Sequence, residues 1–494
     1  MSSSLFDRAC IAALAFSCSV ATAGEIHPRV RADARANGSV DAIIVFADQS
    51  RPTLPLAAAG NYHERRHALV DALRSRSEHA QRSVRARLDA HGIAHRDFWI
   101  ANLMQARIPA AVLDDLGARK DIARIDPNPV IALHLPPASP PAAPALTASI
   151  AWGVTKIEAP QVWAAGFTGQ GVVIAGEDTG YQWNHPALKT HYRGWNGTSA
   201  DHNYNWHDAI HDAAGNPCNN DAPAPCDDDG HGTHTAGTFA GDDGGTQQIG
   251  VAPGARWIGC RNMDRGDGTP ARYIECMQWL LAPTDLAGNN ANPDLAPDVI
   301  SNSWSCPVSE GCTLGSELET AVDNLVAGGI FYAAAAQNYG TQGCATIFDP
   351  PAIYDASFVV GATNSSDALA NFSSLGPVSG SALIRPDLVA PGESIYSSIP
   401  ANAYGSKSGT SMATPHVAGA AALLMSAFPA LKGKPREVGQ ILRATAVTQG
   451  VSDPYQSSCG GTPITTWPNY LAGYGRLDVW NAYRDIIFID GLDN

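Results

Sequence analysis

The pattern of apolar and polar positions divides the chain into two folded segments on either side of a proline-rich stretch. In the first segment, apolar runs typical of strands alternate with two amphipathic helical patterns. The expected order is strand, helix, strand or hairpin, helix and strand, at residues 40–46, 61–92, 98–108, 110–118 and 121–131. This β-α-β-β-α-β order predicts a small ferredoxin-like α+β domain over residues 24–135.

The second segment alternates short, continuously apolar runs with helical patterns. Strands are predicted at residues 171–178, 255–263, 298–304, 330–336 and 357–363, and helices at 231–241, 271–282, 314–329 and from 409 onward. Strands that are apolar throughout are typical of a parallel sheet that is buried on both faces. We therefore predict an α/β domain over residues 150–494, with a mostly parallel sheet and helices on both faces.

The segments that precede and join these domains have their own composition. Residues 1–23 combine one arginine, a short apolar run and small residues at Ala21 and Ala23, the pattern of a cleaved secretory signal. An N-terminal anchor is the alternative. Residues 136–149, PPASPPAAPALTAS, are rich in proline and carry no charge, which predicts an extended linker. The sequence thus predicts secretion and a domain boundary in the linker.

Cysteines are confined to the signal segment and the second domain. Two of the ten lie in residues 1–23, and the even number that remains predicts disulfides in a secreted chain. Short spacing favours two small loops, a third pair is plausible, and a fourth pair is left over, although eight cysteines allow 105 connectivities. These pairs are Cys218–Cys226, Cys306–Cys312, Cys260–Cys276 and Cys344–Cys459.

The net charge of −15 is unevenly distributed along the chain. Residues 24–135 carry 16 basic and 13 acidic side chains, whereas residues 136–494 carry 15 basic and 33 acidic ones. Such an acidic body argues against nucleic acids and anionic membranes as partners. The opposite sign of the two segments is consistent with binding between them.

Three segments carry candidate chemistry where strands end or helices begin, which is where sites form in open parallel sheets. Asp178 ends a predicted strand, GHGTHTAGT contains His231 and His234, and GTSMATPHVAG contains Ser411 and His416. Ser411 is expected at the positive end of a helix dipole, whereas His416 lies inside the same helix and points along its flank. The base for Ser411 must therefore come from elsewhere. A turn carboxylate, a helix cap and a zinc-binding histidine pair are the alternatives for these residues.

The segments DTG, GHGTHTAGT and SGTSMATPHVAG, in this order, resemble the three signatures of subtilisin-like serine proteases. The resemblance covers roughly residues 150–485 and is closest to the bacillopeptidase F-like branch, and residues 40–135 resemble the family's inhibitory prodomain. It implies that Asp178 orients His231, that His231 is the general base, and that Ser411 is the nucleophile. Asn338 is implied as an oxyanion donor together with the Ser411 amide. Gln337 departs from the family, which usually has glycine before that asparagine.

The resemblance also implies a substrate groove and a set of cofactors. The groove edges match Ser303, Trp304 and Ser305 on one side and Ala333, Ala334 and Ala335 on the other. Asp349 falls near the floor of the specificity pocket, with a surface turn residue as the alternative. No cofactor is expected for catalysis. A structural calcium ion is common in the family, and the acidic segment 218–230 is a candidate site with unassigned ligands and a plain solvated loop as the alternative.

The function implied by the resemblance is that of a secreted, monomeric serine endopeptidase acting on proteins and peptides. Residues 24–135 would act as an intramolecular inhibitor, and cleavage in the linker would start the mature chain near Ile150. A catalytically silent binding protein is one alternative, and a metal-dependent hydrolase using His231, His234 and the acidic residues 227–229 is another. The tail, residues 486–494, is either a last strand or an export-related end.

Overall fold

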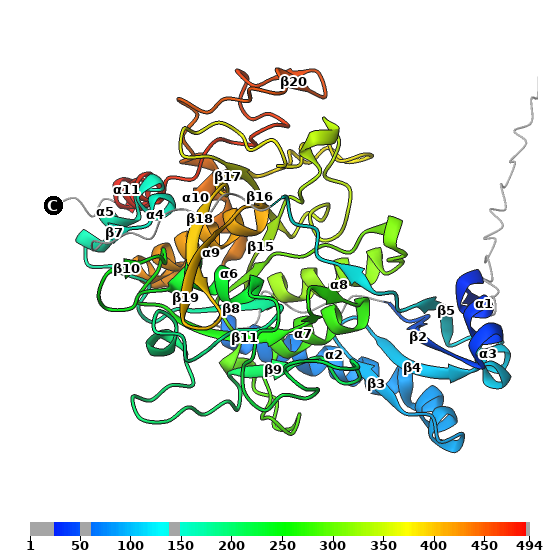
Figure 1. Cartoon of the computed structure of the whole chain (residues 1–494). Coiled ribbons are helices and arrows are strands. Elements are labelled where there is room, and N and C mark those ends of the chain that lie inside the picture. The colour runs from blue at the N-terminus through cyan, green and yellow to red at the C-terminus, as the bar shows by residue number, and fades with distance from the viewer. Residues whose placement is uncertain (1–23, 50–60, 138–148, 491–494) are drawn as a thin grey trace, which may run out of the picture.

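The computed structural model describes residues 24–49, 61–137 and 149–490 and shows a small N-terminal domain beside a larger α/β domain (Figure 1). The predicted signal segment, most of the predicted linker and the last four residues lie outside the described residues. Within the described ranges, no helix is long and apolar enough to cross a membrane.

Seven strands form the central sheet of the larger domain, and every neighbouring pair is parallel. Their order is β17 (Leu388–Pro391), β16 (Phe358–Thr363), β15 (Phe331–Ala335), β14 (Val299–Asn302), β8 (Val173–Asp178), β11 (Arg256–Arg261) and β9 (Trp206–Asp208). The chain first extends the sheet from β8 to one side and then returns to the other side with β14. The strand order therefore reverses between β8 and β14. The predicted parallel α/β fold is confirmed, and β9 and β17 are strands that the apolar pattern did not reveal.

Successive residues of each central strand enter two different hydrophobic cores. Ile174 and Val299 belong to one core, and Ala175 and Ile300 belong to the other, because strand side chains alternate between faces. One core is covered by α4 (Trp152–Lys156), α5 (Ala159–Ala164), α6 (His231–Ala240), α9 (Thr410–Ala427), α10 (Pro435–Ala444) and α11 (Val479–Asp490). The other is covered by α7 (Pro270–Leu281) and α8 (Gly315–Ala327). Burial on both faces explains why these strands are apolar throughout.

The N-terminal domain is a five-stranded sheet in the order β1, β5, β2, β4, β3. The strands are β1 (Glu25–Ile26), β2 (Ser39–Phe46), β3 (His95–Phe98), β4 (Leu103–Pro109) and β5 (Ile122–Pro127), and the helices are α1 (Pro28–Asn37), α2 (Tyr62–Ala90) and α3 (Ala110–Gly117). The predicted β-α-β-β-α-β order is present from β2 to β5, with a hairpin at β3 and β4. The structure adds β1 and α1, which the sequence pattern did not predict.

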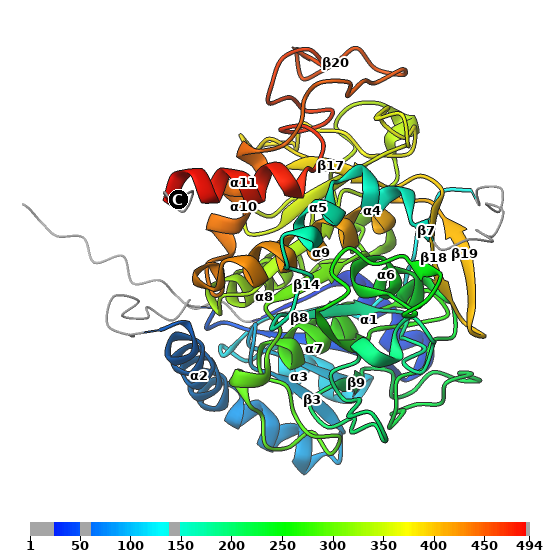
Figure 2. The same ribbon diagram turned by 90° about the vertical axis from the view of Figure 1, so that its left-hand side faces the viewer.

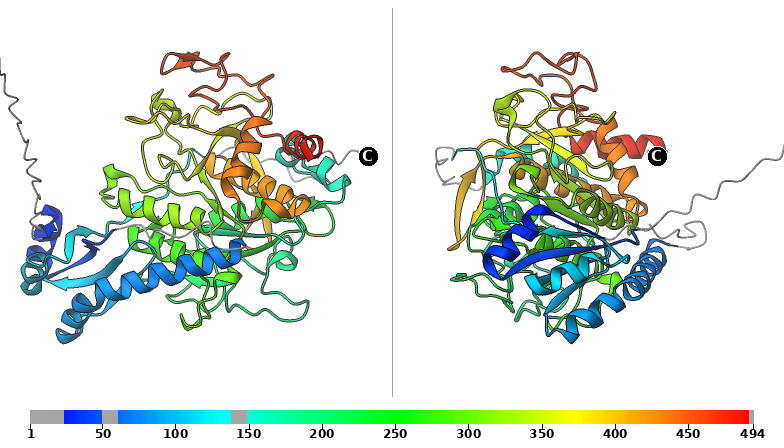
Figure 3. Two further views of the ribbon diagram at one scale, coloured as in Figure 1. Left: turned by 180° about the vertical axis from the view of Figure 1, so that it is seen from behind. Right: turned by 90° about the vertical axis from the view of Figure 1, so that its right-hand side faces the viewer.

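One face of the N-terminal sheet packs against the larger domain. Ile43 and Val45 belong to the same core as α7 and α8, whereas Ile44 faces the domain's own core. Arg66 of α2 is buried in the contact and donates from Nε to the Gly328 carbonyl at 2.7 Å. Figures 1 and 3 show α2 and this sheet alongside the α7–α8 side, and Figure 2 shows α10 and α11 on the side away from α2.

Within the described residues, four short sheets of two or three strands lie beside the central sheet, and one of them includes β6 (Ile131–Ala132) from the N-terminal segment. They are β6 with β12 (Met263–Asp264) and β13 (Asp267–Gly268), β7 (Ser149–Ile150) with β10 (Gln247–Gln248), β18 (Ile395–Ile399) with β19 (Ala403–Lys407), and β20 (Ser458–Cys459) with β21 (Thr462–Pro463). The four favoured disulfides are all present. Residues 486–490 continue helix α11, so the alternative of a last strand is wrong for them.

Candidate active site

The candidate residues gather where the strand order reverses, at the carboxyl ends of the parallel strands. Asp178 is the last residue of β8, His231 is the first residue of α6, and Ser411 is the second residue of α9. Ser303 directly follows β14, and Asn338 follows β15 after a short turn. Parallel sheets place ligand-binding residues at this topological switch point.

Asp178 and His231 form a buried hydrogen-bonded pair. The His231 Nδ1 lies 2.7 Å from Asp178 Oδ1, and both side chains are almost fully buried. The Thr179 amide and the Thr235 hydroxyl also donate to the Asp178 carboxylate, at 2.7 and 3.2 Å. Because an ionised carboxylate only accepts hydrogen bonds, the Nδ1 proton is fixed and Nε2 is left with a lone pair. His231 Nε2 is buried and has no hydrogen-bond partner among the described residues.

Helix α6 is held close to β8 by a glycine and a carboxylate. A Cβ at Gly232 would lie 2.1 Å from the Gly180 carbonyl oxygen, so only glycine allows this approach. Asp227 accepts from the Thr233 amide at 2.9 Å and from the Thr179 hydroxyl at 2.9 Å. These contacts tie the first turn of α6 to the end of β8 and thereby set the position of His231.

Ser411 is buried at the start of α9, behind a glycine with an unusual backbone. Gly409 has a φ of 151°, which side chains other than glycine rarely adopt. The Ser411 hydroxyl donates to the Ser303 carbonyl at 3.2 Å and makes no hydrogen bond with His231 in this structure. The Ser303 hydroxyl in turn donates to the Ser411 carbonyl at 3.1 Å.

Pro415 lies inside helix α9, four residues after Ser411. It is the sixth residue of the helix and not part of the first turn. A residue with an amide hydrogen at this position would donate to the Ser411 carbonyl four residues earlier. Proline has no amide hydrogen, so the Ser303 hydroxyl donates to the Ser411 carbonyl instead. A residue of the site therefore satisfies the carbonyl that Pro415 leaves without a helical donor.

The other two histidines of the motifs have structural contacts. His416 Nδ1 lies 2.9 Å from the Met412 carbonyl oxygen, and burial lowers its pKa to about 4. His234 Nε2 lies 2.9 Å from the Ile395 carbonyl oxygen, and burial lowers its pKa to about 3. Both imidazoles are therefore neutral at pH 7, and each is hydrogen-bonded to a main-chain carbonyl.

Asn338 is oriented by its neighbour in α9 and contacts the N-terminal segment. Its Oδ1 accepts from the Thr410 amide at 2.9 Å, and its Nδ2 donates to the His134 carbonyl at 2.9 Å. Gln337 has a φ of 76°, so it adopts the left-handed backbone that normally favours glycine. Its side-chain amide donates to the Asp349 carbonyl at 2.7 Å, which helps to hold that turn.

The groove beside Ser411 differs in part from the one that the sequence predicts. Ser303, Trp304, Ser305 and Ala335 line it together with residues 132–134. Ala333 and Ala334 do not line it, because their side chains are fully buried in the two hydrophobic cores. The side chains of these two residues point into opposite core layers, as alternate strand residues do, and their predicted role in substrate binding stays a prediction.

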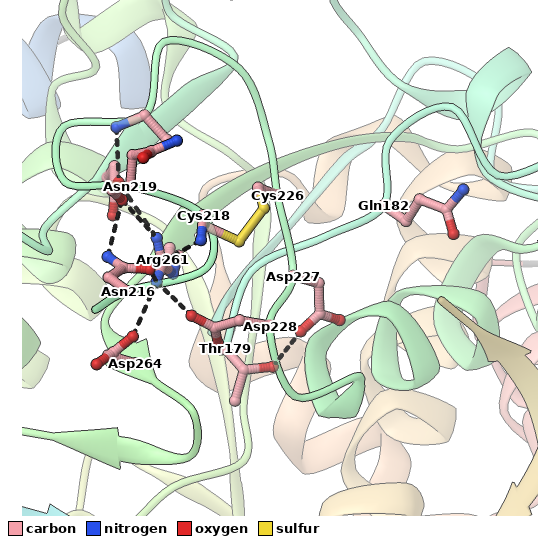
Figure 4. Close-up of a disulfide and its surroundings, with 12 residues drawn as sticks. Thr179, Gln182, Asn216, Cys218, Asn219, Cys226, Asp227, Asp228, Arg261 and Asp264 are labelled. Atoms are coloured by element: carbon pink, nitrogen blue, oxygen red, sulfur yellow. Dashed lines mark hydrogen bonds and ion pairs between the residues drawn. A yellow bond between two sulfur atoms is a disulfide. The ribbon is translucent and has the colours of Figure 1, made fainter. Parts of the chain in front are cut away.

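The acidic segment 218–230, the candidate calcium site, lies beside a buried arginine and contributes one carboxylate, Asp228, to it. Arg261 is fully buried, and its guanidinium contacts the carboxylates of Asp228 and Asp264 (Figure 4). It also contacts the carboxylate of Asp208, at 3.4 Å. It also donates to Asn216 Oδ1 at 2.6 Å. No group of three or more acidic, histidine or cysteine side chains suited to a metal ion occurs among the described residues. A cationic side chain thus supplies the charge that this cluster of carboxylates requires.

A parallel α/β domain with Asp, His and Ser in this order at the carboxyl edge has the design of a serine hydrolase. The family model for the subtilase family matches residues 169–462. The chain belongs to the subtilase family and is related to its bacillopeptidase F branch.

Individual relatives agree with this assignment. The chain is 36% identical to bacillopeptidase F of Bacillus subtilis (strain 168) over 456 residues, which cover 88% of this chain but 30% of that protein. It is 36% identical to subtilisin NAT of Bacillus subtilis subsp. natto over 308 residues, covering 62% of this chain and 68% of the relative. It is 32% identical to an alkaline protease of Alkalihalobacillus alcalophilus over 339 residues, covering 67% and 75%.

Proposed function

We propose that the protein is a secreted serine endopeptidase that hydrolyses peptide bonds in proteins through Asp178, His231 and Ser411. The observation that carries this proposal is the buried Asp178–His231 pair with its unpartnered Nε2, at the same edge of the sheet as Ser411 in the first turn of α9. A catalytically silent binding protein would have no need for a buried imidazole with a free acceptor, because an unsatisfied polar atom costs stability.

In the proposed reaction, the Ser411 hydroxyl turns from the Ser303 carbonyl to His231 and attacks the scissile carbonyl carbon. His231 Nε2 takes the hydroxyl proton and later gives it to the leaving amine, while Asp178 stabilises the imidazolium. The Asn338 amide and the Ser411 main-chain amide stabilise the oxyanion. Water then attacks the acyl-enzyme. His231 takes a proton from this water and returns it to the Ser411 oxygen as the acid product leaves.

We further propose that the N-terminal domain acts as the enzyme's own inhibitor. Its sheet packs on α7 and α8, and residues 131–134 lie along the groove. A charged contact also joins the two domains, since Arg124 contacts Glu317.

A structural calcium ion remains a prediction without assigned ligands, and a thermal shift on chelation would test it.

The test of the proposed chemistry is covalent labelling by a fluorophosphonate, followed by peptide mapping. We expect labelling at Ser411 in the wild type, none in Ser411→Ala, and cleavage of casein that a chelator does not abolish at low temperature. Labelling of another residue, or casein cleavage by Ser411→Ala, would overturn the proposal.

A further inference from the structure

The segment Ile131–His134 lies in the groove as an added strand. Its last residue places the peptide bond between His134 and Leu135 next to Asn338. Ile131 pairs antiparallel with Gly268, and the Leu133 amide donates to the Gly266 carbonyl at 2.8 Å. The His134 carbonyl then accepts from Asn338 Nδ2 at 2.9 Å. The side chain proposed to hold an oxyanion therefore holds the carbonyl oxygen of the bond between His134 and Leu135.

Glu310 contacts this segment at two points. Its Oε2 accepts from the Ala132 amide at 2.8 Å, and its Oε1 contacts His134 Nε2 directly. The amides of successive strand residues point to opposite edges, so the Leu133 amide meets Gly266 and the Ala132 amide meets Glu310. Glu310 thus contacts both the main chain of the segment and the side chain that precedes the His134–Leu135 bond.

Asp349 adds a second carboxylate that interacts with the same imidazole. Its side chain is 2% exposed, and its Oδ2 has no hydrogen-bond partner in the part of the chain that the structure describes. It interacts electrostatically with His134 and Glu310, and the Tyr339 ring lies 6.1 Å from the His134 ring. The imidazole thus contacts Glu310, lies near the Tyr339 ring and interacts electrostatically with Asp349.

Glu310 lies in a short loop that a disulfide closes. Glu310 ends a short helical turn, Val308–Glu310, inside the loop closed by the Cys306–Cys312 disulfide. This loop begins directly after the groove residues Ser303–Ser305. The acid is thus attached to the wall of the groove, and it is not carried by the N-terminal domain.

We propose that Glu310 and Asp349 form a specificity site that selects a cationic residue before the scissile bond, and that the His134–Leu135 bond is the first that the enzyme cuts in its own chain. This inference rests on the proposed serine endopeptidase function. Ser411 forms the ester with the His134 carbonyl carbon, and Leu135 leaves as the amine with the proton from His231. Water then releases His134 as a carboxylate and restores the serine hydroxyl. A later cut in residues 136–149 gives the start near Ile150 that the sequence predicts.

The specificity site is tested with enzyme that is expressed as the full chain and allowed to mature. The substrates are Ile-Ala-Leu-X-Leu-Pro peptides with arginine, glutamine or leucine at X. We expect kcat/KM for arginine to exceed that for glutamine by at least tenfold. Glu310→Gln should lower this ratio about tenfold, the scale of one partly exposed charge-assisted hydrogen bond. The control Glu437→Gln removes an exposed carboxylate elsewhere and should leave the ratio unchanged.

The bond is tested by measuring the C-terminus of the released N-terminal fragment by mass spectrometry. A fragment that ends at His134 in the earliest sample supports the proposal, and a first fragment that ends elsewhere overturns it. An enzyme that cleaves peptides without a basic preference, or whose preference survives Glu310→Gln, overturns the specificity site while the proposed function stands. An enzyme that cleaves no peptide and is not labelled by fluorophosphonate overturns both.

Discussion

Replacement of Arg261 by methionine tests whether this buried guanidinium neutralises the acidic cluster next to the site. Its side chain is fully buried, and so, almost completely, are the carboxylates of Asp208, Asp228 and Asp264 that it contacts. Burial raises the pKa of Asp228 to about 6 even with the guanidinium present. Arg261→Met would leave these carboxylates without the cation that lies between them.

The expected cost follows from the burial of the charges. Removal of one partner from a buried ion pair typically costs about 3–5 kcal/mol, because the remaining charge stays desolvated. A domain of about 345 residues unfolds with an entropy near 0.7 kcal/mol/K, at about 2.1 cal/mol/K per residue. The thermal midpoint of the α/β domain should therefore fall by about 4–7 °C.

The matched control is Arg265→Met, four residues along the chain. Arg265 contacts the same Asp264 at 3.1 Å, but its side chain is 51% exposed. An exposed ion pair contributes about 0–1 kcal/mol, so the midpoint should shift by no more than about 1–2 °C. Both variants are made in the Ser411→Ala background to prevent self-digestion, and unfolding is followed by calorimetry. Equal midpoint shifts for the two variants would refute the reasoning.

Three further predictions concern the site and its support. Burial raises the pKa of Asp349 to about 6, so this carboxyl is mostly neutral at pH 5 and mostly ionised at pH 7.5. The arginine-to-glutamine ratio of kcat/KM should therefore rise several-fold across that range, and a ratio that stays flat would contradict this. Asp178→Asn should lower kcat by about 10⁴-fold because His231 loses the group that fixes its tautomer, and a loss under tenfold would contradict the pair's role. Replacing Cys344 and Cys459 by serine opens a loop with a sequence separation of 115, and should cost about 4–5 kcal/mol in calorimetric stability. A cost under about 1 kcal/mol would argue against that estimate.

The fold was largely predictable because its strands are buried on both faces. Runs such as those at residues 171–178 and 298–304 read as continuous apolar segments, and they became β8 and β14. Helix α1 was missed because its composition is dominated by charge, and only Val30 and Ala34 of it are buried. The two-residue strand β6 has no periodic pattern of its own, since its partner β13 lies far along the chain.

The candidate site was predictable where it follows chain order and local motifs. Asp178 lies at the end of a strand, and His231 and Ser411 lie in the first turn of a helix. The apolar pattern predicted that strand and both helices. Glu310 was not predictable, because it lies in a polar loop without a motif and its role depends on contacts with a distant segment. Arg261 was hidden in the same way, inside an apolar strand whose partners are the loop carboxylates.

The central claim is that this chain is a serine endopeptidase that matures itself through Ser411. The most direct measurement is the intact mass of the secreted product when wild type and Ser411→Ala are expressed side by side. The account predicts a wild type that loses its N-terminal domain and a variant that keeps it. A variant that matures in the same way, without added protease, would contradict the claim.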